Sequence, residues 1–170
     1  MRTIYELPVE AVIMSSLCNI RSFYKDGERV CHSNDGVAPA PVSTEPQAKK
    51  CAVCFQNQWG SQITPNGKRG KGCTAYSRLT MRQLSDPNDA LTLRVPASSL
   101  KSFRDYEKEV TSRGEALHRV VTKVDATHEE HRSLLAFRVM RFLSDGELDT
   151  LTQASKRVAL SFPVSDGFTY

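Results

Sequence analysis

The sequence has little of what would make a membrane-spanning, secreted or fibrous protein. No uninterrupted apolar run is longer than four residues, as at residues 11–14, so no membrane-spanning helix is expected. The first ten residues contain Arg2, Glu6 and Glu10, and a secretory signal peptide would have an apolar stretch here instead. With only 9 glycines and 8 prolines in 170 residues, it has no collagen-like or disordered composition. We expect a single soluble domain in the cytoplasm.

Acidic residues are absent from one stretch, residues 49–82. Residues 1–48 hold four basic and six acidic side chains, and residues 83–170 hold twelve and thirteen. A cationic segment attracts polyanions, of which nucleic acid is the commonest in a cell, although a solvated loop rich in Lys and Arg would look the same. The basic residues of this segment are Lys49, Lys50, Lys68, Arg69, Lys71, Arg78 and Arg82.

The cysteines favour a structural metal site over disulfides. Their number is five, and an odd count in a chain without a secretory signal argues against a disulfide framework. Cys51 and Cys54 form a CxxC pair, Cys31 lies 20 positions before it, and Cys73 lies 19 positions after it. Four thiolates satisfy the tetrahedral preference of Zn²⁺ and leave no open position. We therefore predict one structural Zn²⁺ held by Cys31, Cys51, Cys54 and Cys73.

Other assignments near this pattern stay open. His32 is a rival to Cys31 as the fourth ligand, and Cys18 lies in an apolar stretch typical of a small buried side chain. The CxxC pair could instead be redox-active, but that chemistry usually sits between a strand and a helix. Here the surroundings are rich in proline and glycine, and a long loop of this kind needs something to hold it. Zinc is therefore favoured over a redox pair or free thiols.

The rest of the chain predicts a mainly β protein with helices. The expected order is strand, cysteine-bearing insertion, two strands, helix, two strands and a last helix that begins with the capping-box spacing of Ser144 and Glu147. We expect turns at residues 85–89 and 128–131. Strands are expected at residues 9–24, 76–84, 90–95, 117–127 and 133–143, and helices at about 98–113 and 144–160.

A helix between the third and fourth of five strands is the arrangement of an OB-fold barrel. We therefore predict one OB-like α+β domain over residues 1–170, with an inserted zinc subdomain at about 28–75 and the C-terminal helix at about 144–160. A small α+β domain with an attached zinc ribbon would use the same elements. The OB arrangement would place Arg78, Arg82 and Arg94 on the strands with which that fold binds oligonucleotides.

Aromatic residues are interleaved with the cationic segment. Sequence-tolerant binding of single strands needs cations for the phosphates and flat rings for the bases. Trp59 and Tyr76 could stack on bases or fill a small core, whereas a core position is favoured for Phe55. Asn57, Gln58 and Ser61 could hold the loop or meet bases, and the structural role is favoured. The candidate DNA-binding residues are Trp59, Lys68, Arg69, Lys71, Tyr76, Arg78, Arg82 and Arg94.

No catalytic arrangement stands out, and we predict that the protein is not an enzyme. The glycine-rich run at residues 67–72 does not have the spacing of a Walker loop. No His-x-Glu precedes the CxxC pair, as a zinc deaminase would require. His128 and His131 could bind a metal, but they stand beside two glutamates in an expected polar turn.

Five segments of the chain have distinctive sequences: residues 31–39 (CHSNDGVAP), 51–61 (CAVCFQNQWGS), 70–73 (GKGC), 93–101 (LRVPASSLK) and 121–124 (VTKV). Together they resemble a family of phage and mobile-element single-stranded DNA-binding proteins, and the cysteine block is the most specific part of the resemblance. The similarity covers roughly residues 28–145, with Phe55 standing where that family more often has proline. It implies a zinc-bearing, OB-like single-strand binder that acts in replication or recombination, in the host cytoplasm if the protein is viral.

We therefore expect a sequence-tolerant single-stranded DNA-binding protein whose partners are single-stranded DNA and replication or recombination proteins. The alternative is a zinc-ribbon adaptor that binds a protein such as a polymerase or a host factor. The salt dependence of oligonucleotide binding separates the two, because only a DNA binder releases condensed counterions.

Overall fold

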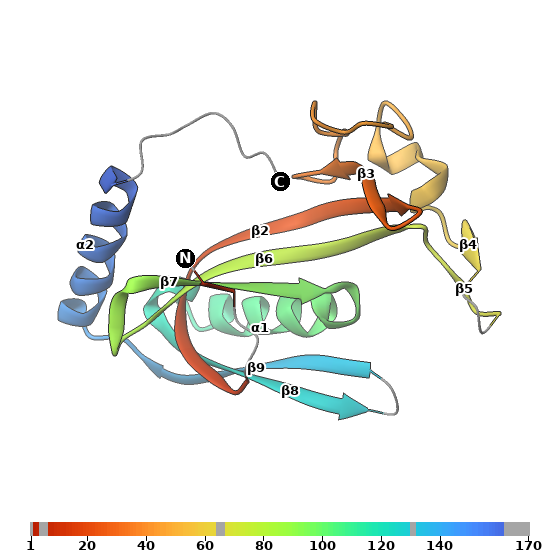
Figure 1. Cartoon of the computed structure of the whole chain (residues 1–170). Helices are drawn as coiled ribbons and strands as arrows, with labels where there is room; N and C mark the ends of the chain where they lie inside the picture. The colour runs from red at the N-terminus through yellow and green to blue at the C-terminus, as the bar shows by residue number, and fades with distance from the viewer. Residues whose placement is uncertain (1, 4–6, 64–66, 130–131, 162–170) are drawn as a thin grey trace. The chain divides into compact units, whose positions relative to one another are not determined.

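The computed structural model describes residues 2–3, 7–63, 67–129 and 132–161 (Figure 1). As predicted, the protein is mainly β with two helices, α1 (Leu100–Ser112) and α2 (Asp145–Ser161). Neither helix combines the length and hydrophobicity that a membrane crossing requires. The strands are β1 (Arg2–Thr3), β2 (Val9–Lys25), β3 (Glu28–Ser33), β4 (Gln62–Ile63), β5 (Arg69–Gly70), β6 (Cys73–Gln83), β7 (Asp86–Pro96), β8 (Val120–Glu129) and β9 (Arg132–Phe142).

Seven strands form one sheet in the order β1-β7-β6-β2-β8-β9, with β3 also paired to β2. Strands β4 and β5 form a separate two-stranded ribbon. The predicted five-stranded barrel is not confirmed, because this order is open and no pairing among the described strands closes it. The short strand β1 instead lies parallel to β7, with Arg2 opposite Leu91, and occupies the edge that closure would use.

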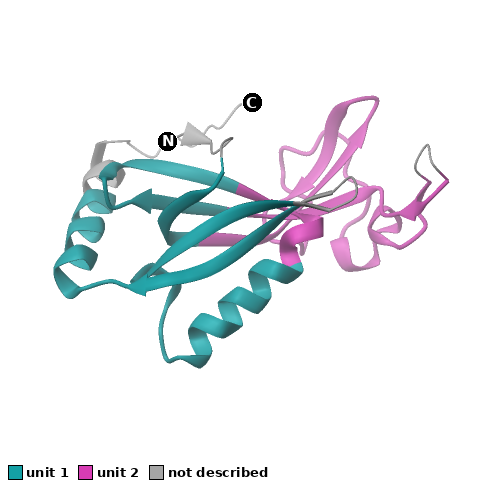
Figure 2. Ribbon diagram, turned by 90° about the horizontal axis from the view of Figure 1, so that it is seen from below, with its two compact units in different colours: residues 1–15, 79–93, 101–170 teal, residues 16–78, 94–100 magenta. Residues whose placement is uncertain are grey.

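The chain forms two compact units (Figure 2). Unit 1 comprises residues 1–15, 79–93 and 101–170, and unit 2 comprises residues 16–78 and 94–100. Strands β2, β6 and β7 each contribute residues to both units. The predicted zinc subdomain at about 28–75 therefore falls within unit 2.

The inner face of α1 builds much of the core of unit 1. Phe103, Tyr106 and Val110 are buried, and their spacing of three and four residues places them on one face of the helix. The rings of Phe103 and Tyr106 lie 5.2 and 5.8 Å from that of Phe137 on β9. The buried Tyr106 hydroxyl shares a 2.6 Å hydrogen bond with the Thr122 hydroxyl, so its polar end is satisfied inside the core.

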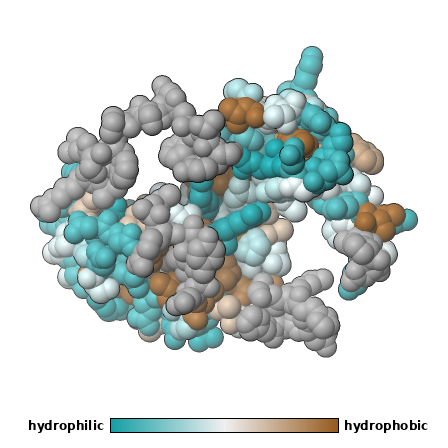
Figure 3. All heavy atoms as spheres, viewed as in Figure 1, coloured by the Kyte–Doolittle hydropathy of each residue, from teal (hydrophilic) through white to brown (hydrophobic). Residues whose placement is uncertain are grey.

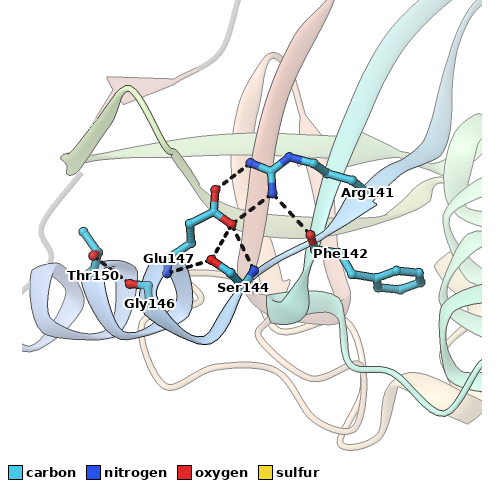
Figure 4. Close-up of polar contacts among 6 residues, drawn as sticks. All are labelled: Arg141, Phe142, Ser144, Gly146, Glu147 and Thr150. Carbon is cyan, nitrogen blue, oxygen red and sulfur yellow. Dashed lines mark hydrogen bonds and ion pairs between the residues drawn. The ribbon is translucent and has the colours of Figure 1, made fainter.

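Helix α2 covers a second cluster of the same unit, in which its Leu151 packs with Val12, Val121 and Leu143. The predicted capping box opens this helix (Figure 4). The Ser144 N–H donates to Glu147 Oε2 at 2.9 Å, and the Glu147 N–H donates back to Ser144 Oγ at 3.4 Å. The Arg141 guanidinium completes the site with an ion pair to Glu147 at 2.6 Å.

These contacts make the start of α2 sensitive to acid. The hydrogen bonds from Arg141 and then from Ser144 lower the pKa of Glu147 from its ordinary 4.5 to about 2. The stabilisation is therefore fully present above about pH 4.5 and is lost as the pH falls toward 2.

We expect Glu147→Gln to lower the melting temperature at pH 7, and the difference from wild type to vanish near pH 2. Circular dichroism melts across this range measure the difference, with Asp149→Asn on the same helix as control. A difference that stayed constant from pH 7 to pH 2 would contradict the assignment.

Strands include residues that were expected in both turns. The first hairpin turns at Leu84 and Ser85, and β7 already begins at Asp86. Strand β8 continues through His128 and Glu129, which pair with Ser133 and Arg132 of β9. His131 lies outside the described residues. Polar residues expected in the turns therefore belong to the strands, because the backbone pairing of each hairpin extends further than the polarity of the sequence indicates.

The prediction that Cys18 is buried is wrong, since its side chain is exposed. The neighbouring Asn19 has a φ of 61°, which interrupts the regular alternation of β2 at this point.

Candidate metal centre and cationic surface

One cavity of unit 2 brings together the cysteines whose spacing predicted a metal site. Cys31 comes from β3 and Cys73 begins β6. Cys51 begins a short 3₁₀ turn, η1 (Cys51–Val53), and Cys54 precedes a second one, η2 (Phe55–Asn57). The residues that line the cavity are Arg21, Phe23, Cys31, His32, Ser33, Pro39, Gln47, Ala48, Cys51, Cys54, Gln56, Asn57 and Cys73.

Backbone turns fold the CxxC segment into a knuckle. The Cys54 N–H donates to the Cys51 carbonyl at 3.4 Å, and the Asn57 N–H donates to the Cys54 carbonyl at 3.0 Å. The Asn57 amide Nδ2 also donates to the Cys51 carbonyl at 2.8 Å. Asn57 therefore holds the loop, as predicted, and keeps both cysteines of the pair facing one side.

The turn at residues 33–37 fixes where this knuckle begins. Asp35 Oδ1 accepts hydrogen bonds from the Ser33 hydroxyl and from the Val37 N–H. The Val37 carbonyl in turn accepts the Cys51 N–H at 2.8 Å. Gly36 between them has a φ of +78°, and a Cβ there would stand 2.8 Å from the Asn19 carbonyl oxygen. Only glycine fits this conformation and this close approach.

The four thiols are near enough to influence one another electrostatically. Burial raises the pKa of the Cys73 thiol, and the Arg21 guanidinium lowers it. The thiols of Cys51, Cys54 and Cys31 each raise it further. Four thiolates sharing a buried space are a donor set suited to Zn²⁺, which would offset their mutual repulsion.

The positions of these side chains are not yet those of a formed metal site. In the chain as described, no group of three or more His, Cys, Asp or Glu side chains is arranged so that it could hold a metal ion. Tetrahedral zinc with Zn–S bonds of about 2.3 Å requires sulfur atoms about 3.8 Å apart. The donor chemistry therefore fits zinc, while binding would require the four thiols to converge further.

His32 lines the same cavity and remains a rival to Cys31 as the fourth ligand. Burial, together with the charge of Arg29, lowers the pKa of its imidazole. A histidine held neutral has a free lone pair for a metal.

A second layer of polar contacts supports the knuckle. The Ser61 hydroxyl donates to the Gln56 carbonyl at 3.0 Å and accepts the Gly72 N–H at 2.9 Å. The predicted structural role of Ser61 is confirmed. Gly72 leads directly into Cys73, and it packs closely against the side chains of Gln56 and Phe23.

The side chain of Arg21 also enters this cavity, which sequence reasoning missed. Arg21 Nη1 donates to Asn57 Oδ1 at 2.6 Å, and Lys71 Nζ donates to the same oxygen at 3.3 Å. A lone arginine in a strand carries no motif, and it lies 36 positions from Asn57 in the chain. Only the folded chain brings the two together.

The rings of Phe55 and Trp59, which follow the knuckle in the chain, face solvent. Trp59 is 75% exposed and Phe55 is 65% exposed, so the core position favoured for Phe55 is wrong. The reason is that the cavity behind the knuckle is lined by Phe23 from β2 instead. The aliphatic residues Val53 and Ile63 are exposed as well. Figure 3 shows apolar patches lying between hydrophilic ones on this part of the surface.

Most of the predicted cationic contacts are accessible. Lys68, Arg69, Lys71, Arg78 and Arg94 are all exposed. The Arg94 guanidinium lies 4.1 Å from the centroid of the half-buried Tyr76 ring, in a cation–π contact.

Arg82 does not belong to this accessible group, and the prediction that it contacts DNA is wrong. Its side chain is only 4% exposed, and its Nη1 donates to the Pro87 carbonyl across the β6–β7 hairpin of unit 1. Its position on a strand gave no sign of this, because the guanidinium is held by a backbone carbonyl of the neighbouring strand β7.

Comparison of the chain with known protein families, with curated proteins and with solved structures finds no significant match. Its function must therefore be inferred from the residues of unit 2 themselves.

Proposed function

We propose that the protein binds single-stranded DNA, with little sequence preference, through the exposed aromatic and cationic surface of unit 2. The observation that carries this proposal is Trp59, the only tryptophan, which is 75% exposed in a segment that holds no acidic residue. A large exposed ring beside lysine and arginine is the combination with which proteins stack bases and neutralise phosphates.

One structural zinc ion would hold this surface in shape. The residues that would bind it are Cys31, Cys51, Cys54 and Cys73, with His32 as the alternative to Cys31. When bound, zinc supplies a cross-link among β3, the knuckle and the start of β6. The chain itself supplies the turns that present Trp59, Lys68 and Arg69 on the outside of that cross-link.

We also propose that these strands form a partly open OB-fold. The five longest strands have the order β7-β6-β2-β8-β9, with α1 between β7 and β8 in the chain. An OB-fold has this order of neighbours, and such barrels can be partly open. The exposed Arg78 and Arg94 belong to β6 and β7, the second and third strands of that arrangement, where OB-folds bind oligonucleotides.

The resemblance of the cysteine block to phage and mobile-element proteins supports a role in DNA replication or recombination, without catalysis by the protein itself. Its partners would then be single-stranded DNA and other replication or recombination proteins, in the cytoplasm of a host cell.

One observation favours a second candidate, a zinc-ribbon adaptor that binds a protein. Val53 on η1 is 71% exposed and Ile63 on β4 is 67% exposed, and aliphatic side chains contribute little to base stacking. Exposed apolar groups together often mark a protein-binding surface.

Fluorescence anisotropy with labelled oligo(dT) and a duplex of equal length tests the proposal. We expect zinc-loaded protein to prefer the single strand and its affinity to fall steeply with salt. If about five cations meet phosphates, the slope of log K against log salt is about −3.5. Equal affinity for the duplex would contradict a preference for single strands, and weak binding with a slope near zero would favour the adaptor.

A further inference from the structure

Arg21 places a cation inside the cysteine cavity of unit 2. It lies on β2, opposite Ser33 of β3, and its side chain lines the cavity together with the four cysteines. Its Nη1 donates to Asn57 Oδ1 at 2.6 Å, whereas its Nε is buried without a hydrogen-bond partner. The guanidinium is therefore fixed at one end and still has an unsatisfied donor in an enclosed space.

No carboxylate balances this charge within the cavity. Among the described residues that line it, none is Asp or Glu, and the acidic groups present are the thiols. Arg21 is half-buried and its Nε is shielded from solvent, and a cation withdrawn from water without an anion is costly. Zinc with four thiolates carries a net charge of −2, so the metal centre and the arginine would each supply the charge that the other lacks.

Neighbouring residues keep the guanidinium in place. Asn57 accepts from Arg21 and from Lys71 through Oδ1, while its Nδ2 holds the Cys51 carbonyl. A Cβ at Gly36 would stand 3.3 Å from Arg21 Nε, so glycine leaves room for the side chain. The same amide thus orients both the CxxC segment and the cation.

We propose that Arg21 is the charge-balancing residue of the metal centre: its guanidinium offsets the negative charge of the zinc thiolates and does not contact DNA. This inference rests on the proposed zinc site, but it does not depend on DNA binding. Arg21 acts as a positioning residue, because it works through the ligands and not on a substrate.

The test compares Arg21→Lys, which keeps the charge, with Arg21→Gln, which keeps a donor for Asn57 but is neutral. Zinc dissociation constants are measured by chelator competition, and Co²⁺ absorption spectra report whether the ligand set is intact. We expect Arg21→Gln to weaken zinc binding by about 10- to 100-fold, as changes around metal ligands typically do, and Arg21→Lys by no more than about threefold. The salt slope for oligo(dT) should stay unchanged in both variants once they are saturated with zinc.

Three results would overturn the inference. They are equal weakening of zinc binding by both variants, unchanged zinc affinity with a reduced salt slope, and absence of zinc binding by the wild type. If Arg21→Gln does not fold, Arg21→Lys alone decides: a loss of more than about tenfold in zinc affinity would overturn the role of charge. If the wild type binds zinc but no oligonucleotide, the proposed function fails. The zinc affinities of the two variants still test whether Arg21 balances the charge of the metal centre.

Discussion

Replacing Cys51 with serine is expected to abolish zinc binding and to unfold the region from residue 31 to 73. Across residues 28–63 and 67–75 the only buried hydrophobic side chains are Val30, Cys51 and Cys54. So small a core cannot offset the loss of conformational entropy on folding. Zinc binding supplies on the order of 10 kcal/mol in small metal-dependent domains, so removing one ligand should remove most of the stability of this region.

Elemental analysis and amide hydrogen exchange measure the two effects. We expect one zinc per wild-type chain, close to none in Cys51→Ser, and lost protection of the knuckle amides in the variant. The core of α1 and β9 in unit 1 should stay protected, because Phe103 and Tyr106 pack against Phe137 without any help from the metal.

Cys18→Ser is the matched control for the loss of a thiol. Cys18 is exposed and does not line the cavity, so its replacement should leave the zinc content at one per chain. A wild-type protein without metal would contradict the zinc assignment as a whole. Full zinc occupancy in Cys51→Ser would remove Cys51 from the ligand set.

The sequence predicted helices and strands well where their features depend only on residues close together in the chain. In the expected strand at residues 90–95, Leu91, Leu93 and Val95 are buried and Arg94 is exposed, which is the alternation typical of a half-buried strand. The capping-box spacing predicted the start of α2, because the contacts of Ser144 with Glu147 form within one turn of chain. Such features depend on near neighbours alone.

Features that depend on distant segments were missed or wrong. Asp26 and Gly27, with φ of 53° and 85°, form the turn of a β2–β3 hairpin. An Asp-Gly pair is typical of such turns, but the sequence analysis did not predict strand β3. Closure of the barrel depends on which strands pair at its edges. The pattern of apolar and polar residues along the chain does not predict that β1 pairs with β7.

The same division holds for the candidate site. Cysteine spacing predicted four residues that line one cavity, since ligand spacing reflects the reach of short loops. The inward side chain of Arg21 and the burial of Arg82 depend on partners supplied by the fold, Asn57 for the first and the Pro87 carbonyl for the second. Exposure of Phe55 likewise depends on the position of another ring, that of Phe23.

Replacing Trp59 with alanine is expected to weaken oligo(dT) binding by about 5- to 150-fold, because stacking one base is worth about 1–3 kcal/mol. The ring is 75% exposed and contributes little to any core, so the melting temperature should change little. Trp59→Phe keeps a flat face and should recover most of the affinity. Since Trp59 is the only tryptophan, its fluorescence should also be quenched when DNA binds to the wild type.

Phe142→Ala is the matched control, because Phe142 is an exposed ring at 41% on β9 of unit 1, outside the cationic segment. Its loss should leave DNA binding unchanged, and equal effects of the two alanine variants would remove Trp59 from the interface. The salt slope separates stacking from charge. Trp59→Ala should shift affinity at every salt concentration without changing the slope, whereas Arg69→Gln should reduce the slope by about 0.7. A protein-binding adaptor would show neither effect, since its weak attraction for DNA would not depend on one ring.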